Sequence, residues 1–311
     1  RLDTHGAVNL ILTDGSHLTT EWGINVKEGD TFTVYAQSTG EDTMGRLTAC
    51  LPQDSNSYGH VEYYVWPQSG MSGIGSSTRW RKHKSGIDEN AGTIIINGGY
   101  ILAKGQDGAS AIGGGGGDNV TWSYESDIRQ CGSITINGGI VRTEPVTIHT
   151  TPSNVGIGYY QHGYGGSVTI NGGEVTATGG NQAAGIGSGT MGGRIQIQIN
   201  GGTVNATGGS QGAGIGDGME CSNDGSITIT GGTVTATGGY QGTGIGGGAK
   251  TPGGKITISG GTVTANGADG ASGIGHGGLG ATGGEITISG GTVTATGGSG
   301  NPGISCQDAP E

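Results

Sequence analysis

Apolar and polar residues alternate along most of this chain in short runs that are separated by glycines. The run Ile-Thr-Ile recurs at 227–229, 256–258 and 286–288, and the run Val-Thr-Ala-Thr follows it at 234–237 and 293–296. Alternation with a period of two is typical of a β-strand that buries one face. No apolar spacing of three or four survives, and each glycine would cost a helix about 1 kcal/mol. The pattern therefore predicts an all-β protein.

The strand runs belong to a repeat that returns at a nearly constant interval. The valine of each Gly-Gly-x-Val lies 29, 30, 29 and 30 residues after the one before, and an isoleucine follows each valine by eleven residues. A period held this closely is typical of a solenoid, in which each repeat is one supersecondary unit. The residues concerned are Val175, Val204, Val234, Val263 and Val293, with Ile186, Ile215, Ile245, Ile274 and Ile304.

Three strand runs and three turns per repeat describe one coil of a parallel β-helix formed by a single chain. Successive coils should stack about 4.8 Å apart, with Ile, Val and Ala pointing inward and Thr pointing outward. The general preference for right-handed parallel crossovers predicts a right-handed helix. Counting Gly-Ile segments from Ile74 to Ile304 predicts about eight coils, with an irregular N-terminal coil before them.

The regularity of the repeat divides the chain into three parts. Residues 1–46 contain strand-like runs without the repeat motif, and we expect a leading coil or cap there. Residues 47–165 contain coils interrupted by long insertions, and residues 166–311 contain regular repeats and a C-terminal tail. The insertions flank the Gly-Ile segments, so they should project from one side of the helix. Long loops on a rigid scaffold are common places for function.

Composition excludes several classes of protein. Glycine accounts for 75 of the 311 residues, but the Gly-X-Y period of collagen is missing. A net charge of −11 with 12% charged residues argues against nucleic acid as a partner. We find no apolar run long enough for a membrane span and no signal peptide. The first residue is Arg instead of Met, which indicates a processed or trimmed piece of a larger protein.

The insertions contain most of the aromatic side chains outside the leading segment. Aromatic rings with polar edges stack on sugar rings and also form protein interfaces. An equally plain interpretation is that these rings form a satellite core that holds the long loops together. The rings that we consider for ligand binding are Trp66, Trp80, Trp122, Tyr124, Tyr159, Tyr160 and Tyr164.

A basic run surrounds one of these rings. Arg79 and Arg81 flank Trp80, and the run contains four of the thirteen Lys and Arg residues of an acidic chain. Guanidinium groups bind carboxylate, sulfate or phosphate groups well, so the run could bind an acidic glycan. A solvated loop, or a partner for nearby carboxylates, is the alternative.

Carboxylates accompany the rings of another insertion. Asp118, Glu125 and Asp127 lie in the same segment as Trp122 and Tyr124. Glycoside hydrolysis needs two carboxyl groups about 5 to 9.5 Å apart across the scissile bond. If the protein is an enzyme, we therefore expect a glycoside hydrolase that uses Asp118 together with Glu125 or Asp127. Asp and Glu are also common in exposed loops without any catalytic role.

We expect no cofactor and no metal. The histidines and cysteines show no HxxxH or CxxC spacing. Asp and Asn are numerous enough for structural calcium, but neither an EF-hand loop nor a calcium-binding nonapeptide series occurs. Cys50, Cys131, Cys221 and Cys306 fall in distant coils, which predicts free thiols or pairing between molecules.

The repeat GGTVTATGGxxGxGIGxG with ITIxGG resembles glycine-rich β-helix regions of secreted and wall-anchored surface proteins from Gram-positive, gut-type bacteria. The match covers residues 92–304 well and residues 1–91 loosely, and it is specific for architecture. The build is also similar to that of β-helix glycosidases, including the family that contains lacto-N-biosidases, but none of their catalytic motifs matches residue by residue. The resemblance implies an extracellular, secreted or cell-surface location and contact with a glycan or cell-surface polysaccharide.

Three functions are compatible with these observations. The first is an extracellular surface module that binds, and in one version cleaves, glycans through its aromatic loops. The second is a structural or adhesive protein that associates with itself, because a solenoid needs caps and only a short tail follows its last coil. The third is ice binding by outward columns, although Thr is a favoured strand residue in any case. The columns consist of Thr176, Asn205, Thr235, Thr264 and Thr294, and of Thr178, Thr207, Thr237, Asn266 and Thr296.

Overall fold

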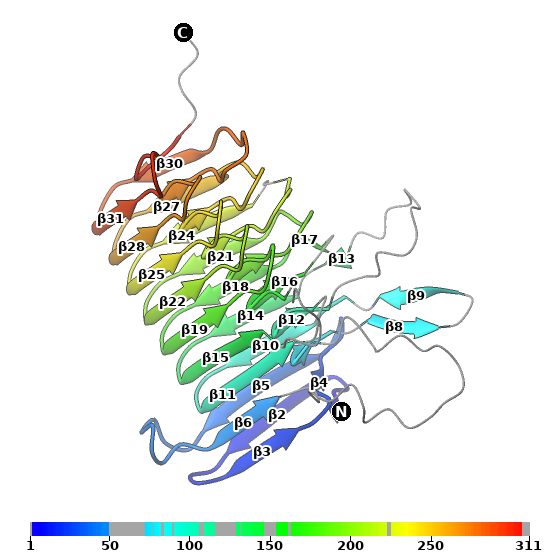
Figure 1. Ribbon diagram of the computed structural model, residues 1–311. Coiled ribbons are helices and arrows are strands. Elements are labelled where there is room, and N and C mark those ends of the chain that lie inside the picture. The colour runs from blue at the N-terminus through cyan, green and yellow to red at the C-terminus, as the bar shows by residue number, and fades with distance from the viewer. Residues whose placement is uncertain are drawn as a thin grey trace.

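The protein is a parallel β-helix, in which three sheets wrap around a single axis (Figure 1). The computed structural model describes residues 2–49, 72–76, 78–81, 84–88, 90–105, 109–115, 129–130, 132–145, 154–160, 163–222 and 225–306. All regular elements among these residues are β-strands. Each of the three sheets has nine strands, and all neighbouring strands within them are parallel, which confirms the predicted fold.

The sheets are named A, B and C in the order in which the chain visits them. Sheet A consists of β1 (Leu2–Asp3), β4 (Ile24–Asn25), β7 (Ile74–Gly75), β12 (Ile112–Gly114), β16 (Ile157–Tyr159), β20 (Ile186–Ser188), β23 (Ile215–Gly216), β26 (Ile245–Gly246) and β29 (Ile274–Gly275). Sheet B consists of β2 (Ala7–Leu12), β5 (Thr31–Ala36), β10 (Thr93–Ile96), β14 (Ser133–Ile136), β18 (Ser167–Ile170), β21 (Gln196–Ile199), β24 (Ser226–Ile229), β27 (Lys255–Ile258) and β30 (Glu285–Ile288). Sheet C consists of β3 (His17–Thr20), β6 (Arg46–Ala49), β11 (Tyr100–Gly105), β15 (Ile140–Pro145), β19 (Glu174–Thr178), β22 (Thr203–Thr207), β25 (Thr233–Thr237), β28 (Thr262–Asn266) and β31 (Thr292–Thr296).

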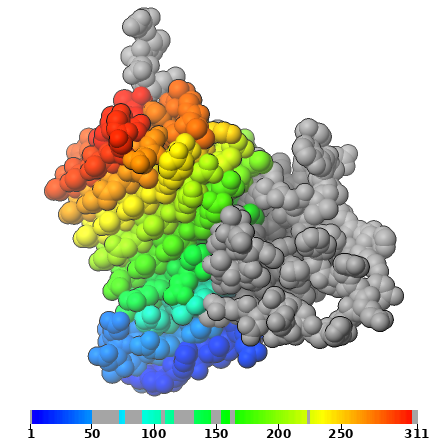
Figure 2. All heavy atoms as spheres, in the orientation of Figure 1, coloured from blue at the N-terminus to red at the C-terminus, as the bar shows by residue number. Residues whose placement is uncertain are grey.

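One strand from each sheet makes one coil, and we number the coils from one (β1, β2, β3) to nine (β29, β30, β31). The coils follow one another as parallel bands from the N-terminal end of the stack to its C-terminal end (Figure 2). The Gly-Ile segments are the short strands of sheet A in coils three to nine. The last of them, at Ile304, pairs with Ile274 as an isolated bridge and begins a tenth turn.

The interior consists of aligned columns of apolar side chains. Val175, Val204, Val234 and Val263 follow one another in register along sheet C and are buried. Val293 continues the column but is only partly buried, because no coil covers it in the described chain. The neighbouring outward positions hold Thr or Asn in the predicted columns. Burial of these apolar columns holds the stack together, since a single coil has no interior of its own.

The leading residues differ from the expectation of one irregular coil, because they form two coils in register with the rest. Phe32 lies in the same column as Ile94, and Leu47 in the same column as Ile101. Larger inward side chains and longer turns between sheets B and C replace the repeat motif here, so the motif does not reveal these coils. Within the described chain the stack therefore extends back to β1.

Glycine is required at two places in each regular coil. In the turn from sheet B to sheet C, the second glycine has a φ of 84° to 91° in coils three to nine, which disfavours any residue with a Cβ. In sheet A, the glycine after the isoleucine of coils three to eight faces the glycine of the next coil. A Cβ on Gly216, for example, would collide with the carbonyl oxygen of Gly246. Close approach of successive backbones therefore requires glycine at this column.

Side-chain amides form a ladder along the turn between sheets B and C. Asn137 donates from Nδ2 to Oδ1 of Asn97 at 2.7 Å, and Asn171 donates in the same way to Asn137 at 2.7 Å. Asn200 donates to Asn171 at 2.8 Å, and the hydroxyl of Thr230 donates to Asn200 at 2.9 Å. The ladder joins coils three to seven on the surface.

Four further strands lie outside the three sheets. β8 (Thr78–Arg81) and β9 (Lys84–Asp88) form an antiparallel hairpin, and β13 (Arg129–Gln130) pairs with β17 (Gly163–Tyr164). Each follows a strand of sheet A and precedes the next strand of sheet B, in coils three, four and five. They lie on the same side of the helix (Figure 1). For these strands, the prediction that the insertions share one side is confirmed.

Candidate functional site

The described residues include only some of the residues predicted to bind a ligand. Arg79, Trp80 and Arg81 lie in β8, and Tyr164 lies in β17, so these four residues belong to the strands outside the three sheets. The remaining predictions Trp66, Asp118, Trp122, Tyr124, Glu125 and Asp127 fall outside the described residues.

Tyr159 and Tyr160 have a packing role instead of the predicted binding role. Tyr159 is the last residue of β16 and is 3% exposed, with its ring against the backbone of Gly114 in the preceding coil. Tyr160 is 8% exposed and packs with Val155 and Ala183 in a small cluster of its own. A buried ring offers no face to a sugar, so these two tyrosines fit the satellite-core interpretation.

Two narrow hollows lie where the chain passes from sheet A to sheet B. One is lined by residues of coils three to six, including Tyr159, Gly113 and Gly158. The other is lined by residues of coils six to eight, including Asp217 and Lys255. Both arise because the glycine columns leave no side chain to fill the corner between sheet A and sheet B. Neither has room for more than one water molecule, so a sugar ring does not fit in them.

A buried polar cluster occupies the second of these corners. Ser188, at the end of β20, donates its hydroxyl proton to Oδ1 of Asp217 in the next coil at 2.6 Å. Burial raises the pKa of Asp217 to about 6, and the hydrogen bond from Ser188 opposes this rise. Asp217 is therefore a carboxyl group that titrates close to neutral pH inside the helix.

Cys221 lies beside this pair as an unreactive thiol. Its Sγ lies 3.5 Å from the hydroxyl of Ser188 and donates to the carbonyl oxygen of Gly189 at 2.9 Å. Burial, reinforced by the charge of Asp217, raises the pKa of the Cys221 thiol far above its usual range. Since the thiolate is the nucleophile, this cysteine is not a candidate for covalent catalysis. Cys221 and Cys306 are both free thiols, as predicted for these two cysteines.

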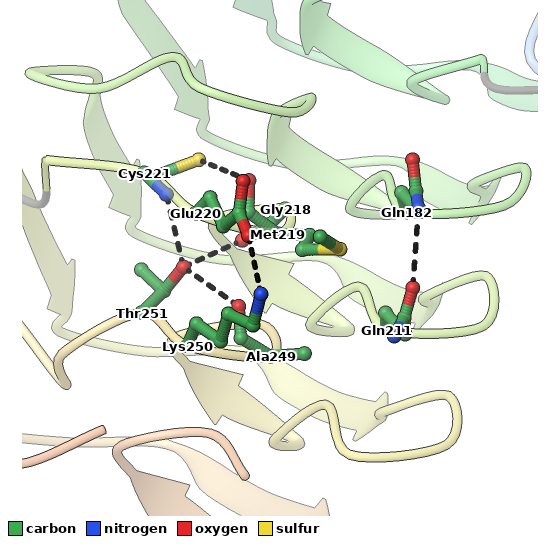
Figure 3. Close-up of polar contacts among 9 residues, drawn as sticks. All are labelled: Gln182, Gln211, Gly218, Met219, Glu220, Cys221, Ala249, Lys250 and Thr251. Carbon is green, nitrogen blue, oxygen red and sulfur yellow. Dashed lines mark hydrogen bonds and ion pairs between the residues drawn. The ribbon is translucent and has the colours of Figure 1, made fainter. Parts of the chain in front are cut away.

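Thr251 of coil eight fixes the turn that carries Cys221 (Figure 3). Its hydroxyl accepts from the backbone N–H of Cys221 at 3.0 Å and lies 2.9 Å from the carbonyl oxygen of Gly218, to which it donates. Hydrogen bonds in this cluster therefore link three successive coils. Each buried polar group found here has a partner within the helix, which is the expected condition for stable burial.

Two rows of longer side chains lie along the turns that flank sheet A (Figure 3). Nε2 of Gln182 donates to Oε1 of Gln211 at 3.2 Å in one row, and Nζ of Lys250 pairs with Oε1 of Glu220 at 2.6 Å in the other. Glu220 and Lys250 both have a φ of 58°, which is unusual for residues with side chains. Hydrogen bonds from their backbone N–H groups to the next coil hold this conformation.

The described residues offer few candidates for metal or covalent chemistry. They contain no group of three or more His, Cys, Asp or Glu side chains that could hold a metal ion. The Ser188–Asp217 pair has no histidine among its hydrogen-bond partners in the described chain. The Ser188 hydroxyl is the donor of the hydrogen bond to the carboxylate, so no general base acts on it. The cluster fills a corner of the helix with satisfied polar groups.

The sequence contained a signal for this cluster that the search for catalytic motifs missed. Ser188 and Asp217 both follow an Ile-Gly pair at the same place in consecutive repeats. Because repeats stack in register, two such residues must be neighbours. Reading each column of the repeat, instead of each segment of the chain, would have paired them.

Comparison with known proteins supports the repeat. A family model described as beta helix repeat matches residues 168–190, 197–219, 227–249, 256–275 and 286–306. Each matched segment begins in sheet B, passes through sheet C and ends in or after sheet A. Neither the curated proteins nor the solved structures searched give a match. Residues 168–306 are thus a β-helix repeat region. No helix that could cross a membrane occurs in the described part of the chain.

Proposed function

We propose that the protein is a rigid β-helical scaffold, secreted or attached to the cell surface, that presents glycan-binding loops on its sheet A side. The observation that carries the proposal is the position of the additional strands. β8, β9, β13 and β17 all enter between sheet A and sheet B, in three successive coils. The turns between sheets B and C remain three residues long in the same coils, at 97–99, 137–139 and 171–173. Additions confined to one side are typical of a binding face on a solenoid.

The residue types on this side suit a carbohydrate ligand. The hairpin of β8 and β9 carries Arg79, Trp80 and Arg81, which combine a large ring with two guanidinium groups. The sugar rings of a glycan would stack on the tryptophan ring, and its carboxylate or sulfate groups would accept bidentate hydrogen bonds from the guanidinium groups. Trp66, Trp122 and Tyr124 belong to insertions that precede or follow strands of sheet A in the sequence, and they extend the proposal to these insertions.

A glycan array tests the proposal. The intact protein should bind a limited set of glycans, and Trp80→Ala or Trp122→Ala should weaken binding by roughly 1 to 3 kcal/mol, the range of an interface hot spot. Thr235→Ala, on the outward face of sheet C, is the matched control and should leave binding unchanged. Binding that is equal in all four proteins, or no binding to any glycan, would refute the proposal.

Cleavage is the catalytic version of the same proposal. Asp118, Glu125 and Asp127 are the carboxylates that it would use, one as general acid and another as nucleophile or base. Incubation of the bound glycans with the protein should then release reducing ends. Asp118→Asn, Glu125→Gln and Asp127→Asn, made one at a time, should include variants that still bind but no longer cleave. Unchanged turnover in all three would remove the catalytic assignment and leave a binding module.

A further inference from the structure

Within the described chain, residues with side chains adopt a left-handed backbone conformation only beside sheet A. Eight non-glycine residues have a φ between 55° and 68°, and all lie in the turns that enter or leave the sheet A strands of coils six to nine. Figure 3 shows two neighbours from each of the two rows that seven of them form. We call these rows the glutamine row (Gln182, Gln211 and Gln241) and the outer row (Met191, Glu220, Lys250 and Leu279).

The two rows are bonded to each other and lie side by side. The backbone N–H of Met219 donates to the carbonyl oxygen of Gln182 at 3.1 Å, and that of Ala249 donates to the carbonyl oxygen of Gln211 at 3.0 Å. Met219 and Ala249 each directly precede a residue of the outer row. Because both rows repeat with each coil, their side chains recur at the coil spacing of about 4.8 Å. The rows therefore form one surface that extends along the axis.

The fold of these turns does not require glutamine. The coil after Gln241 has Gly270 at the same place, with a φ of 88°, and the sheets on either side keep their register. Glycine adopts this conformation without strain, whereas a residue with a Cβ does not. Strained residues of this kind cluster at functional sites. In a chain with 75 glycines, three glutamines at a place that glycine fills equally well indicate that their side chains have a function.

The glutamine row has free hydrogen-bonding groups. Nε2 of Gln182 donates to Oε1 of Gln211, which leaves Oε1 of Gln182 and Nε2 of Gln211 without a partner in the described chain. The side chain of Gln241 makes no hydrogen bond to any described residue, and its stem lies against Gly270. All three glutamines are partly buried, so their stems are held in place. Amides that are fixed in this way are preorganised to bind a ligand.

An exposed aromatic ring lies next to the last of these amides. Tyr240 is 57% exposed, and its side chain has no ring contact or hydrogen bond with the described residues. Such a ring gives a sugar a face to stack on. Lys250, the only cation in the two rows, pairs with Glu220 at 2.6 Å, and Asp269 takes the place of Tyr240 in the next coil. Without a free cation, the surface suits a neutral ligand better than an acidic one.

We propose that the glutamine row and Tyr240 form a binding site for a neutral polysaccharide that follows the axis of the β-helix. Tyr240 stacks on one sugar ring, and the amides of Gln241 and Gln211 form hydrogen bonds with hydroxyl groups of that ring and of the next. Amides that recur with each coil fit a polymer of similar sugar units better than a single sugar. The site involves coils six to eight, whereas the hairpin of β8 and β9 belongs to coil three.

Affinity electrophoresis of the full chain tests the proposal. Native gels that each contain dextran, mixed-linkage β-glucan, galactomannan or arabinoxylan are compared with a gel without polysaccharide, and at least one polysaccharide should retard the protein. Tyr240→Ala and Gln241→Gly should each raise the dissociation constant roughly tenfold. Thr262→Ala, at an exposed position of β28, is the matched control and should bind like the unchanged chain. Retardation by none of these polysaccharides, or equal retardation of Tyr240→Ala and Thr262→Ala, overturns the proposal.

Gln241→Gly also separates a binding role from a structural one. The side chain has no hydrogen bond to lose in the described chain, and glycine suits the left-handed conformation. The melting temperature should therefore stay the same or rise while binding falls, as expected of a residue that is kept for function. A lower melting temperature would mean that Gln241 serves the fold, and the proposal would be wrong.

Two further measurements distinguish this site from other uses of the surface. Trp80→Ala, in β8, should leave binding of the neutral polysaccharide unchanged, so this site and the acidic-glycan loops can fail independently. If Trp80→Ala abolishes the retardation and Tyr240→Ala does not, the neutral polysaccharide binds at the loops and the present site is refuted. Sedimentation velocity tests a protein partner. Self-association that Tyr240→Ala abolishes, with no retardation by any polysaccharide, would assign the surface to a second copy of the chain instead.

Discussion

Inward and outward residues alternate along each strand, so two adjacent positions of one strand should differ sharply in their tolerance of charge. Val234 lies in the buried column of sheet C, and Thr235 next to it faces outward. Val234→Asp places a carboxylate without a partner in a dry interior, which should cost several kcal/mol. Thr235→Asp should be much milder. Thermal unfolding of the two variants measures the difference, and equal losses of melting temperature would mean that the faces are reversed.

Two glycines with positive φ separate the cost of the backbone conformation from the cost of a steric clash. Gly216→Ala would bring a Cβ against the carbonyl oxygen of Gly246 at a position with a φ of 133°. Gly280→Ala also meets a positive φ, of 78°, but its Cβ would enter open space. We expect about 1–2 kcal/mol of destabilisation at Gly280 from the backbone conformation. Gly216→Ala should cost clearly more in denaturant unfolding, because two coils must move apart. Equal losses of unfolding free energy in the two variants would show that neighbouring coils move apart with little cost.

The buried carboxyl of Asp217 makes stability depend on pH. Its pKa rises from 3.8 in the unfolded chain to about 6 in the folded protein. Below pH 3.8 both states are protonated and the group has no effect. Between these two pKa values the unfolded state ionises first, so stability falls as pH rises, by about 3 kcal/mol in total, and then levels off.

Asp217→Asn removes this dependence and keeps an acceptor for Ser188. The variant should match the wild type near pH 4 and melt at a higher temperature near pH 7. Melting temperatures across this range measure the effect, and Asp42→Asn, at an exposed position, is the control. A wild type that remains the more stable protein at pH 7 would mean that the carboxylate is stabilised in the folded state.

At the scale of an element, the asparagine ladder couples turns that are about thirty residues apart in the chain. Asn171 uses its amide to donate to Asn137 and its oxygen to accept from Asn200. Asn171→Ala should cost roughly 1–2 kcal/mol, since each exposed hydrogen bond contributes about 0.5–1.5 kcal/mol. The double variant with Asn200→Ala should cost less than the sum of the two single variants, because both remove the same bond. Strictly additive losses in unfolding experiments would show that the hydrogen bond between Asn171 and Asn200 contributes nothing.

The strands and their faces could be predicted because every column repeats five times with small changes. The first two coils could not, because Phe32 and Leu47 fill the columns with larger side chains and no Gly-Gly turn marks the repeat. The role of Tyr159 depends on Gly114 in the preceding coil, which provides the space for its ring. The two coils differ in length, so the sequence does not show that Tyr159 and Gly114 are neighbours. Burial of the Tyr159 ring could therefore not be predicted.

At the scale of the whole molecule, the identical registers imply that the coils are interchangeable units. Removal of residues 234–262 joins Thr233 to Val263 and takes out one coil, so that Val204 meets Val263 in the same column. This variant should fold and lose only a few degrees in melting temperature, because each coil contacts only its neighbours. Removal of residues 234–248 takes out half a coil and is the control. It should abolish cooperative unfolding, since strands of different sheets would then face one another.

The hydrogen bonds between coils all point along the axis of the helix, whereas the covalent chain runs around it. Tension applied to the two ends along this axis therefore falls on the few backbone hydrogen bonds of one terminal coil at a time, and the other coils bear no shearing load. The molecule would yield by peeling, one coil after another, at low force. Each released coil of about thirty residues would lengthen the chain by roughly 100 Å. The extensions should be nearly equal over the regular repeats and longer where an insertion enlarges a coil, so stretching would report the repeat lengths along the chain.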